Sequence, residues 1–137
     1  MNEKQEARIE ELVEEARSVR ERAYAPYSRF LVGAAVLAGD QVFAAPNIEN
    51  ASYPLSVCAE RNAVAAAVSA GHRQIEAVAV VGSGDGPTPP CGGCRQVLFE
   101  FGGPGMTVIA VSPGGERLMW ALEDLLPAAF GPDDLDT

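Results

Sequence analysis

The chain has 137 residues with a formal net charge of −9, and 47% of its residues are hydrophobic. This length and hydrophobic content favour a single domain, residues 1–137, with a core large enough for independent folding. The acidity disfavours a nucleic-acid partner, since a phosphate backbone needs clustered Lys and Arg; an uncharged or cationic small molecule is the easier ligand, and a role in solubility alone is equally compatible.

The N-terminal segment predicts an amphipathic helix from Glu3 to about Arg22. Its apolar residues recur at i, i+3, i+4 and i+7, with charges on the other face: Ile9, Leu12, Val13 and Ala16. The segment is charged from its start, unlike a signal peptide, and no window approaches the roughly 20 apolar residues of a membrane helix. Together with an odd number of cysteines, these features predict a cytoplasmic protein with no membrane partner.

Strand and helix patterns alternate along the rest of the chain. The expected order is a β-hairpin over residues 30–46 that turns at Gly39-Asp40, a loop to residue 56, a helix over Ala59–Ala70 ended by Gly71, a buried strand over Ile75–Val81, a loop over 82–90, a helix from Gly92 to about Phe101, a buried strand over Thr107–Val111, a short strand or turn and then a helix within Arg117–Leu126, and a polar tail from Pro127. Helices that alternate with buried strands predict a sheet layered between helices.

All three cysteines stand next to predicted helix starts. Cys91 and Cys94 have the C-x-x-C spacing of a metal knuckle and share one face of a helical turn, while Cys58 precedes another helix. Exposed N–H groups and the positive dipole end at a helix start favour thiolates. We interpret the three cysteines as ligands of one metal. A redox pair, which predicts nothing about Cys58, and unbound core cysteines are the alternatives.

Three protein ligands favour a catalytic zinc site, because structural sites are closed by four ligands whereas catalytic sites keep one position open for water. The single histidine, His72, is expected in a solvated loop and not as a fourth ligand. Zinc can lower the pKa of water to about 7 and so give a hydroxide nucleophile. Glu60 is the candidate acid/base beside that water, and an ordinary first-turn glutamate is the alternative. Arg61, more than Arg95, is the candidate donor to the ligand sulfurs, with a plain surface arginine as the alternative for Arg95.

The segments C-A-E at 58–60 and P-C-G-G-C at 90–94 form the zinc-deaminase signature in its three-cysteine version. The stretches "AYAPYSRFLVGAAVL", "NIENASY", "CAERNAV", "PCGGCRQVLFEFG" and "LLPAAFGPDDL" further resemble the small homotetrameric cytidine deaminases, from about Ala23 to Leu135. This resemblance implies an α/β fold, a three-layer α-β-α sandwich with a mixed five-stranded sheet, and one Zn²⁺ per subunit. The implied reaction is the hydrolytic deamination of cytidine and deoxycytidine to uridine and deoxyuridine with release of ammonia, a step of pyrimidine salvage.

The resemblance assigns a role to each residue of the signature. Cys58, Cys91 and Cys94 match the zinc ligands. Glu60 matches the proton shuttle, and Arg61 matches the arginine that bonds the ligand thiolates.

It also assigns residues to the substrate. Asn47 and Glu49 match the pair that holds the ribose 3′-hydroxyl, and Phe30 matches the aromatic residue that packs against the pyrimidine. The Ala59 backbone matches a contact to the base. Phe130 matches a C-terminal aromatic residue that reaches a neighbouring subunit's site, which implies a homotetramer with active sites near the subunit interfaces.

Two other functions remain compatible with the sequence. A blasticidin-type or other small-molecule aminohydrolase on the same fold would keep the metal residues but would not need Asn47 and Glu49. A non-catalytic zinc module for protein binding would need neither Glu60 nor an open coordination position. A polynucleotide-editing deaminase is disfavoured by the acidity and by the lack of a basic channel.

Overall fold

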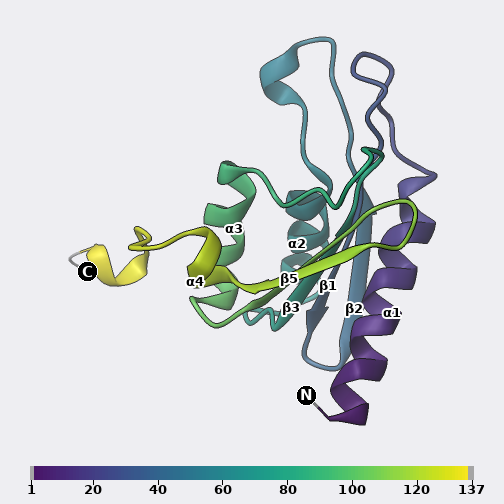
Figure 1. Ribbon diagram of the computed structural model, residues 1–137. Helices are drawn as coiled ribbons and strands as arrows, with labels where there is room; N and C mark the ends of the chain where they lie inside the picture. Colours follow the sequence, from purple (N-terminus) through teal and green to yellow (C-terminus); the bar gives the residue numbers. More distant parts are fainter. Residues whose placement is uncertain (1, 136–137) are drawn as a thin grey trace.

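The computed structural model describes residues 2–135 and contains one five-stranded sheet with the strand order β2-β1-β3-β4-β5 (Figure 1). The elements are α1 (Glu3–Arg20), β1 (Gly33–Ala38), β2 (Gln41–Pro46), η1 (Tyr53–Leu55), α2 (Ala59–Ser69), β3 (Ala77–Val81), α3 (Gly92–Gly102), β4 (Thr107–Val111), β5 (Arg117–Ala121), α4 (Leu122–Leu125) and η2 (Pro132–Asp134). The β3–β4 pair is parallel and the other neighbouring pairs are antiparallel. The mixed five-stranded sheet implied by the resemblance is therefore confirmed.

Helix α1 covers one face of the sheet. It starts at a capping box, in which Asn2 Oδ1 accepts from the Gln5 N–H at 2.9 Å and Gln5 Oε1 accepts from the Asn2 N–H at 3.0 Å. The predicted apolar stripe is buried against small residues of the strands, among them Ala35 and Ala79. Small side chains on this face let the helix backbone approach the sheet closely. The helix ends at Arg20, two residues before the predicted boundary.

Helices α2 and α3 cover the opposite face, so the molecule has the expected three layers (Figure 1). Strand β3 shows why both faces are buried: Val78 and Val80 point to the α2/α3 side, and Ala77, Ala79 and Val81 point to the α1 side. Each fully buried valine contributes roughly 1.5–3 kcal/mol relative to an exposed one. The parallel β3–α3–β4 connection accounts for the continuous apolar runs in the two central strands.

Two predicted strands are too long at their N-terminal ends. The predicted hairpin begins at Phe30, but β1 begins at Gly33. Before it, the Asn47 side chain takes the Val32 N–H and the Phe30 carbonyl, and a single backbone bond, from the Asn47 N–H to the Val32 carbonyl, continues the pairing. The predicted third strand begins at Ile75, but β3 begins at Ala77. Ile75 is buried, yet its N–H donates to the Phe101 carbonyl at the end of α3 and lies outside the ladder.

Strand register brings the important loops to one end of the sheet. The pairing places Gly33 opposite both Pro46 and Val81, and Val81 opposite Val111. The segments that precede β1, follow β2 and follow β3 consequently meet at this end, at the top of Figure 1. Ligand sites of α/β sheets form at the carboxyl ends of parallel strands, and this is that end for β3 and β4.

The end of the chain leaves the body of the fold. The predicted short strand and helix within Arg117–Leu126 are confirmed as β5 and α4, and the segment after α4 projects away from the sheet (Figure 1). Gln96 Nε2 donates to the Phe130 carbonyl oxygen at 2.7 Å and Gly131 is buried beside Phe99, so this segment is held on α3. Within residues 2–135, no helix is both long and apolar enough to cross a bilayer.

Candidate active site

The three cysteines come together at two helix starts. Cys58 is the N-cap of α2, Cys91 is the N-cap of α3, and Cys94 lies in the first turn of α3. The Sγ atoms of Cys91 and Cys94 are 3.3 Å apart, those of Cys58 and Cys91 are 4.0 Å apart, and all three lie within 4.8 Å of one another. The predicted convergence of two helix N-termini is confirmed.

This donor set fits a zinc ion. Tetrahedral ligands with Zn–S bonds of about 2.3 Å stand about 3.8 Å apart, between the two sulfur–sulfur distances given above. The helix N-termini carry positive partial charge, which offsets part of the negative charge of three thiolates. In the part of the chain that the structure describes, these three cysteines are the group of side chains arranged to hold a metal ion.

The proton affinities of the sulfurs are strongly unequal. Hydrogen bonds from the Cys94 thiol and then the Cys91 thiol, helped by the charge of Arg61, lower the pKa of Cys58 to about 6. The hydrogen bond to Cys58, together with burial, raises the pKa of Cys94. The Cys58 thiolate thus forms readily, and its negative charge opposes the deprotonation of a second cysteine. A dication among the sulfurs would remove that repulsion, which is a further reason why the cluster suits a metal.

Glu60 is a buried carboxyl group beside this cluster. It lies in the first turn of α2 with 5% of its surface exposed. Burial raises its pKa to about 7, and the neighbouring Cys58 sulfur acts in the same direction. A carboxyl group with this pKa can both accept and donate a proton at neutral pH, as a general acid/base must.

The two arginines beside the cysteines differ in their contacts. Arg61 is exposed, and it acts on Cys58 through its charge. Arg95 is half-buried and donates from Nε to the Pro90 carbonyl and from Nη1 to the Leu125 carbonyl, both at 2.8 Å. Arg95 therefore ties the start of α3 to α4, which corrects both the surface interpretation and the idea that it bonds a sulfur.

Phe30 and Asn47, two of the predicted substrate residues, are joined by hydrogen bonds. Asn47 Nδ2 donates to the Phe30 carbonyl at 2.9 Å, and Asn47 Oδ1 accepts from the Val32 N–H at 2.9 Å. The Phe30 N–H donates to Ser28 Oγ at 3.0 Å. Both backbone groups of Phe30 are thereby fixed, and the residue remains 37% exposed.

Glu49 belongs to the same network through Ser28, a residue that sequence reasoning did not single out. Glu49 Oε1 accepts from the N–H groups of Tyr27 and Ser28 at 3.0 and 3.1 Å, and Oε2 accepts from the Ser28 hydroxyl. The hydrogen bond from the Ser28 side chain lowers the pKa of Glu49, which keeps it ionised. A small pocket of about 210 Å³ lies here, lined also by Tyr53 and Ser56.

The two remaining predicted site residues, Ala59 and Phe130, differ in burial. Ala59 is fully buried at the start of α2, directly between Cys58 and Glu60. Phe130 follows α4 in the C-terminal segment and is 59% exposed.

The sequence did not predict a role for Asn62. Its Nδ2 donates to the Pro46 carbonyl at 3.0 Å and so fixes α2 against the end of β2.

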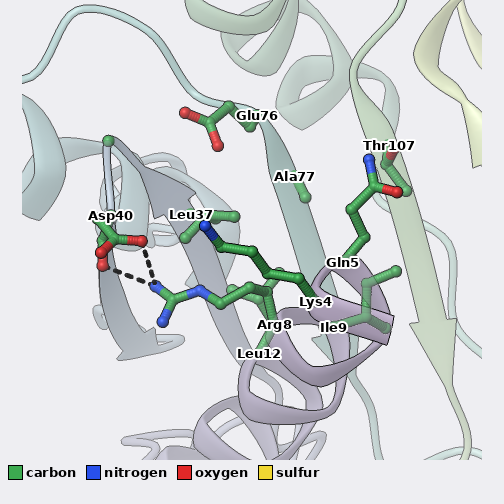
Figure 2. A pocket seen from close by; sticks show the side chains of 11 residues that line it. Lys4, Gln5, Arg8, Ile9, Leu12, Leu37, Asp40, Glu76, Ala77 and Thr107 are labelled. Atoms are coloured by element: carbon green, nitrogen blue, oxygen red, sulfur yellow. Dashed lines mark hydrogen bonds and ion pairs between the residues drawn. The ribbon is translucent and has the colours of Figure 1, made fainter. Parts of the chain in front are cut away.

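A second, larger pocket of about 510 Å³ lies at the other end of the sheet, between α1 and the β1–β2 turn (Figure 2). Lys4 and Arg8 are the cations that line it, and Arg8 is already engaged: it donates to the Asp40 carbonyl at 2.7 Å and pairs with Glu11 at 2.9 Å. His72 also lies away from the cysteines, with Nε2 2.8 Å from Gln41 Oε1 at the start of β2. Neither feature contributes to the cysteine site.

Comparisons with known proteins agree with this geometry. The family model for the cytidine and deoxycytidylate deaminase zinc-binding region matches residues 6–111. The cytidine deaminase of Sporosarcina psychrophila is 45% identical over 128 residues, 93% of this chain and 94% of that protein. That of Halalkalibacterium halodurans is 46% identical over 126 residues, 91% and 96% of the two chains. The crystal structure of cytidine deaminase from Burkholderia pseudomallei matches with a TM-score of 0.85 at 48% identity, over 88% of this chain and 98% of that one.

Proposed function

This chain belongs to the cytidine and deoxycytidylate deaminase family, and we propose that it catalyses the hydrolytic deamination of cytidine and deoxycytidine to uridine and deoxyuridine with release of ammonia. One observation carries the proposal: three cysteine sulfurs within 4.8 Å of one another adjoin the buried carboxyl group of Glu60. A non-catalytic zinc module has no use for such a carboxyl group.

Cys58, Cys91 and Cys94 would hold the zinc ion. When bound, zinc would lower the pKa of water at the site to about 7 and so would make that water a stronger nucleophile toward C4 of the base. The family to which the chain belongs is defined by this zinc-binding region, and the donor geometry fits the ion.

Glu60 would carry the protons of the reaction. Because its pKa is about 7, it can take a proton from the attacking water and give it to ring N3. It can then take the proton of the hydroxyl group now on C4 and pass it to the leaving amine as the C4–N bond breaks, which leaves a carbonyl at C4 and releases ammonia. One carboxyl group thus acts first as base and then as acid, and its burial is the cause of the suitable pKa.

Phe30, Asn47, Glu49 and the backbone of Ala59 would bind the nucleoside. The ionised Glu49 carboxylate and the Asn47 amide lie in one hydrogen-bonded network, suited to sugar hydroxyls that donate and accept. The exposed Phe30 ring offers a face for the pyrimidine. The pair Asn47 and Glu49 favours a nucleoside over a substrate without a sugar hydroxyl at this place.

We further propose a homotetramer in which Phe130 completes a neighbouring site. Large apolar side chains are exposed around the mouth of the site, namely Tyr24, Tyr27, Ile48, Tyr53 and Leu55, with Tyr53 70% exposed. Tyr27 and Tyr53 contact each other with ring centroids 5.9 Å apart. Contiguous exposed apolar residues of this kind mark interaction surfaces. A light-scattering mass of one chain with full activity would exclude both the tetramer and the role of Phe130.

A place in cytoplasmic pyrimidine salvage is consistent with three cysteines that must stay reduced to bind metal. The test of the whole proposal is ammonia release by zinc-loaded protein from cytidine, deoxycytidine, cytosine, CMP and blasticidin S. We expect turnover of the two nucleosides. Turnover of blasticidin S alone would keep the metal chemistry and replace the substrate, whereas stoichiometric zinc without any turnover would leave a structural zinc module.

A further inference from the structure

The Phe30 ring lies close to two glycines of the loop that follows β3. An ideal Cβ placed on Gly82 would stand 3.4 Å from Phe30 Cζ, and one on Gly84 would stand 3.6 Å from Phe30 Cε2. The Thr88 side chain fills the space beside these glycines, and its Oγ1 would lie only 2.5 Å from the ideal Cβ on Gly82. The backbone of Gly82 and Gly84 therefore packs against the Phe30 ring, and the Thr88 side chain packs beside the two glycines.

The loop that contains Gly82 and Gly84 is held by hydrogen bonds to α1 and to the Phe30 segment. Arg20 Nη1, at the end of α1, donates to the Gly82 carbonyl at 2.8 Å. The Ser83 hydroxyl donates to the Leu31 carbonyl at 2.6 Å, directly after Phe30. These bonds hold the loop against the Phe30 segment, so a group inserted between them cannot be absorbed by free movement of the loop.

We propose that Gly82, Gly84 and Thr88 are positioning residues that set where the Phe30 ring stands, and through it the affinity for the pyrimidine of the substrate. The inference rests on the proposed function, since it assigns these residues to the nucleoside site. Neither glycine has a positive φ, so their role is to leave space and not to permit an unusual backbone.

Gly82→Ala is the decisive variant. Its methyl group would lie 2.5 Å from Thr88 Oγ1 and 2.9 Å from Thr88 Cβ, so Thr88 has to move. The same methyl group would touch Phe30 Cζ at 3.4 Å, so the ring has no room to retreat toward the loop when Thr88 shifts. Stacking of a base on an aromatic ring is worth about 1–3 kcal/mol, which is about 5- to 150-fold in affinity. Displacement of the ring loses part of this, so we expect KM for cytidine to rise about three- to tenfold with kcat within about twofold.

Three further variants separate positioning from general damage. Gly86→Ala makes the same change in the same loop, where a Cβ meets nothing within 4 Å, and should match the wild type. Thr88→Gly removes both clashing atoms, so adding Gly82→Ala to the Thr88→Gly protein should change its KM by less than about twofold. Phe30→Ala removes the ring, so adding Gly82→Ala to it should change KM by less than about twofold.

The outcomes are distinct. If the wild type releases no ammonia from cytidine, the proposed function fails. If the wild type is active but Gly82→Ala and Gly86→Ala have the same KM, or if Gly82→Ala adds its full effect in the Phe30→Ala background, the positioning role is wrong. Should Gly82→Ala fail to fold, Gly84→Val carries the same test, because its Cβ already lies 3.6 Å from the ring and its methyl groups extend beyond that point. Zinc content and melting temperature are recorded for every variant.

Discussion

The side-chain amide of Asn47 is bonded to the main chain of Phe30, with Nδ2 2.9 Å from the Phe30 carbonyl oxygen. Its Oδ1 accepts from the Val32 N–H on the other side of the loop. An amide has two hydrogens and two lone pairs, so one of each remains for a sugar hydroxyl. The residue expected to bind the sugar therefore also shapes the loop that carries the base-stacking ring.

Replacing Asn47 by Asp should break the hydrogen bond between the side chain of residue 47 and the Phe30 carbonyl. The new carboxylate still accepts from Val32 but presents a negative oxygen to the Phe30 carbonyl, which leaves that carbonyl without its donor. An unsatisfied group of this kind costs about 1–3 kcal/mol, so kcat/KM for cytidine should fall at least about fivefold. Asn50→Asp is the matched control, since Asn50 uses only its Oδ1, which accepts from the Ser52 N–H. Equal activities of the two variants would contradict the bridging role.

Glu60→Gln should abolish turnover while keeping the metal site. The amide has nearly the same shape but cannot carry a proton, and general acid–base catalysis contributes about 10²- to 10⁴-fold. We expect kcat for cytidine to fall at least about 100-fold, with zinc content and circular dichroism unchanged. Glu100→Gln, an exposed position on α3, serves as the control. Wild-type activity in the Glu60→Gln protein would refute the proposed proton transfer.

Gly33→Ala should weaken the packing of α1 on the sheet. A Cβ at Gly33 would stand 2.0 Å from the Ala16 carbonyl oxygen and 2.8 Å from the Arg20 nitrogen, both in the helix backbone. The helix must shift to admit the methyl group, which costs about 1–3 kcal/mol of unfolding free energy or more. Urea denaturation measures this directly. Gly105→Ala, where a Cβ meets nothing within 4 Å, should leave the midpoint nearly unchanged.

The metal centre could be predicted from the sequence because its signals are local. Each of its cysteines stands at the start of a helix that the apolar periodicity already indicates, and the C-x-x-C spacing alone places Cys91 and Cys94 together. Glu60 follows from its separation of two residues from Cys58. Of the two central strands, β4 agrees with the predicted Thr107–Val111 at both ends, and β3 agrees at its predicted end, Val81.

The supports of the substrate residues could not be predicted, because they depend on which loops meet. Ser28 joins Phe30 to Glu49 across a sequence separation of 21 residues, and nothing around Ser28 marks it. In the sequence, Gly82 and Gly84 look like ordinary loop glycines, and only the structure shows that they pack against the Phe30 ring. The start of β1 was misplaced for a related reason, since the side chain of Asn47, directly after β2, takes the Val32 N–H that a backbone carbonyl of the expected strand would have taken.

Stability should depend on pH through the pair of Glu10 and Arg117. Two hydrogen bonds of 2.7 and 2.8 Å join α1 to the edge strand β5, and the hydrogen bond from Arg117 lowers the pKa of Glu10 below its ordinary value of 4.5. The unfolded chain takes up this proton first as pH falls. The contribution is therefore complete above pH 4.5 and is lost as pH falls through the folded pKa.

The variant Glu10→Gln isolates that contribution. It should unfold at lower urea concentration than the wild type at pH 7, and the difference should shrink progressively below pH 4.5. Glu14→Gln removes the same charge from the same helix, where the structure of residues 2–135 gives no ion pair, and should show little difference at either pH. A Glu10→Gln difference that is constant with pH would mean that the ion pair does not stabilise the fold.

Removal of single ligands should separate metal binding from packing. Cys91 is exposed and Cys94 is fully buried, although both are expected to bind zinc. Cys91→Ala and Cys94→Ala should therefore lose zinc and activity alike. After the wild type and both variants have been stripped of metal by a chelator, Cys94→Ala should be less stable than the wild type by about 1–2 kcal/mol, because the lost sulfur leaves a cavity in the core. Cys91→Ala should lose almost nothing in that comparison. Zinc analysis and urea denaturation measure the two effects. Full zinc occupancy in either variant would overturn the three-cysteine site, and equal stability of the two stripped variants would show that the Cys94 sulfur contributes only as a ligand.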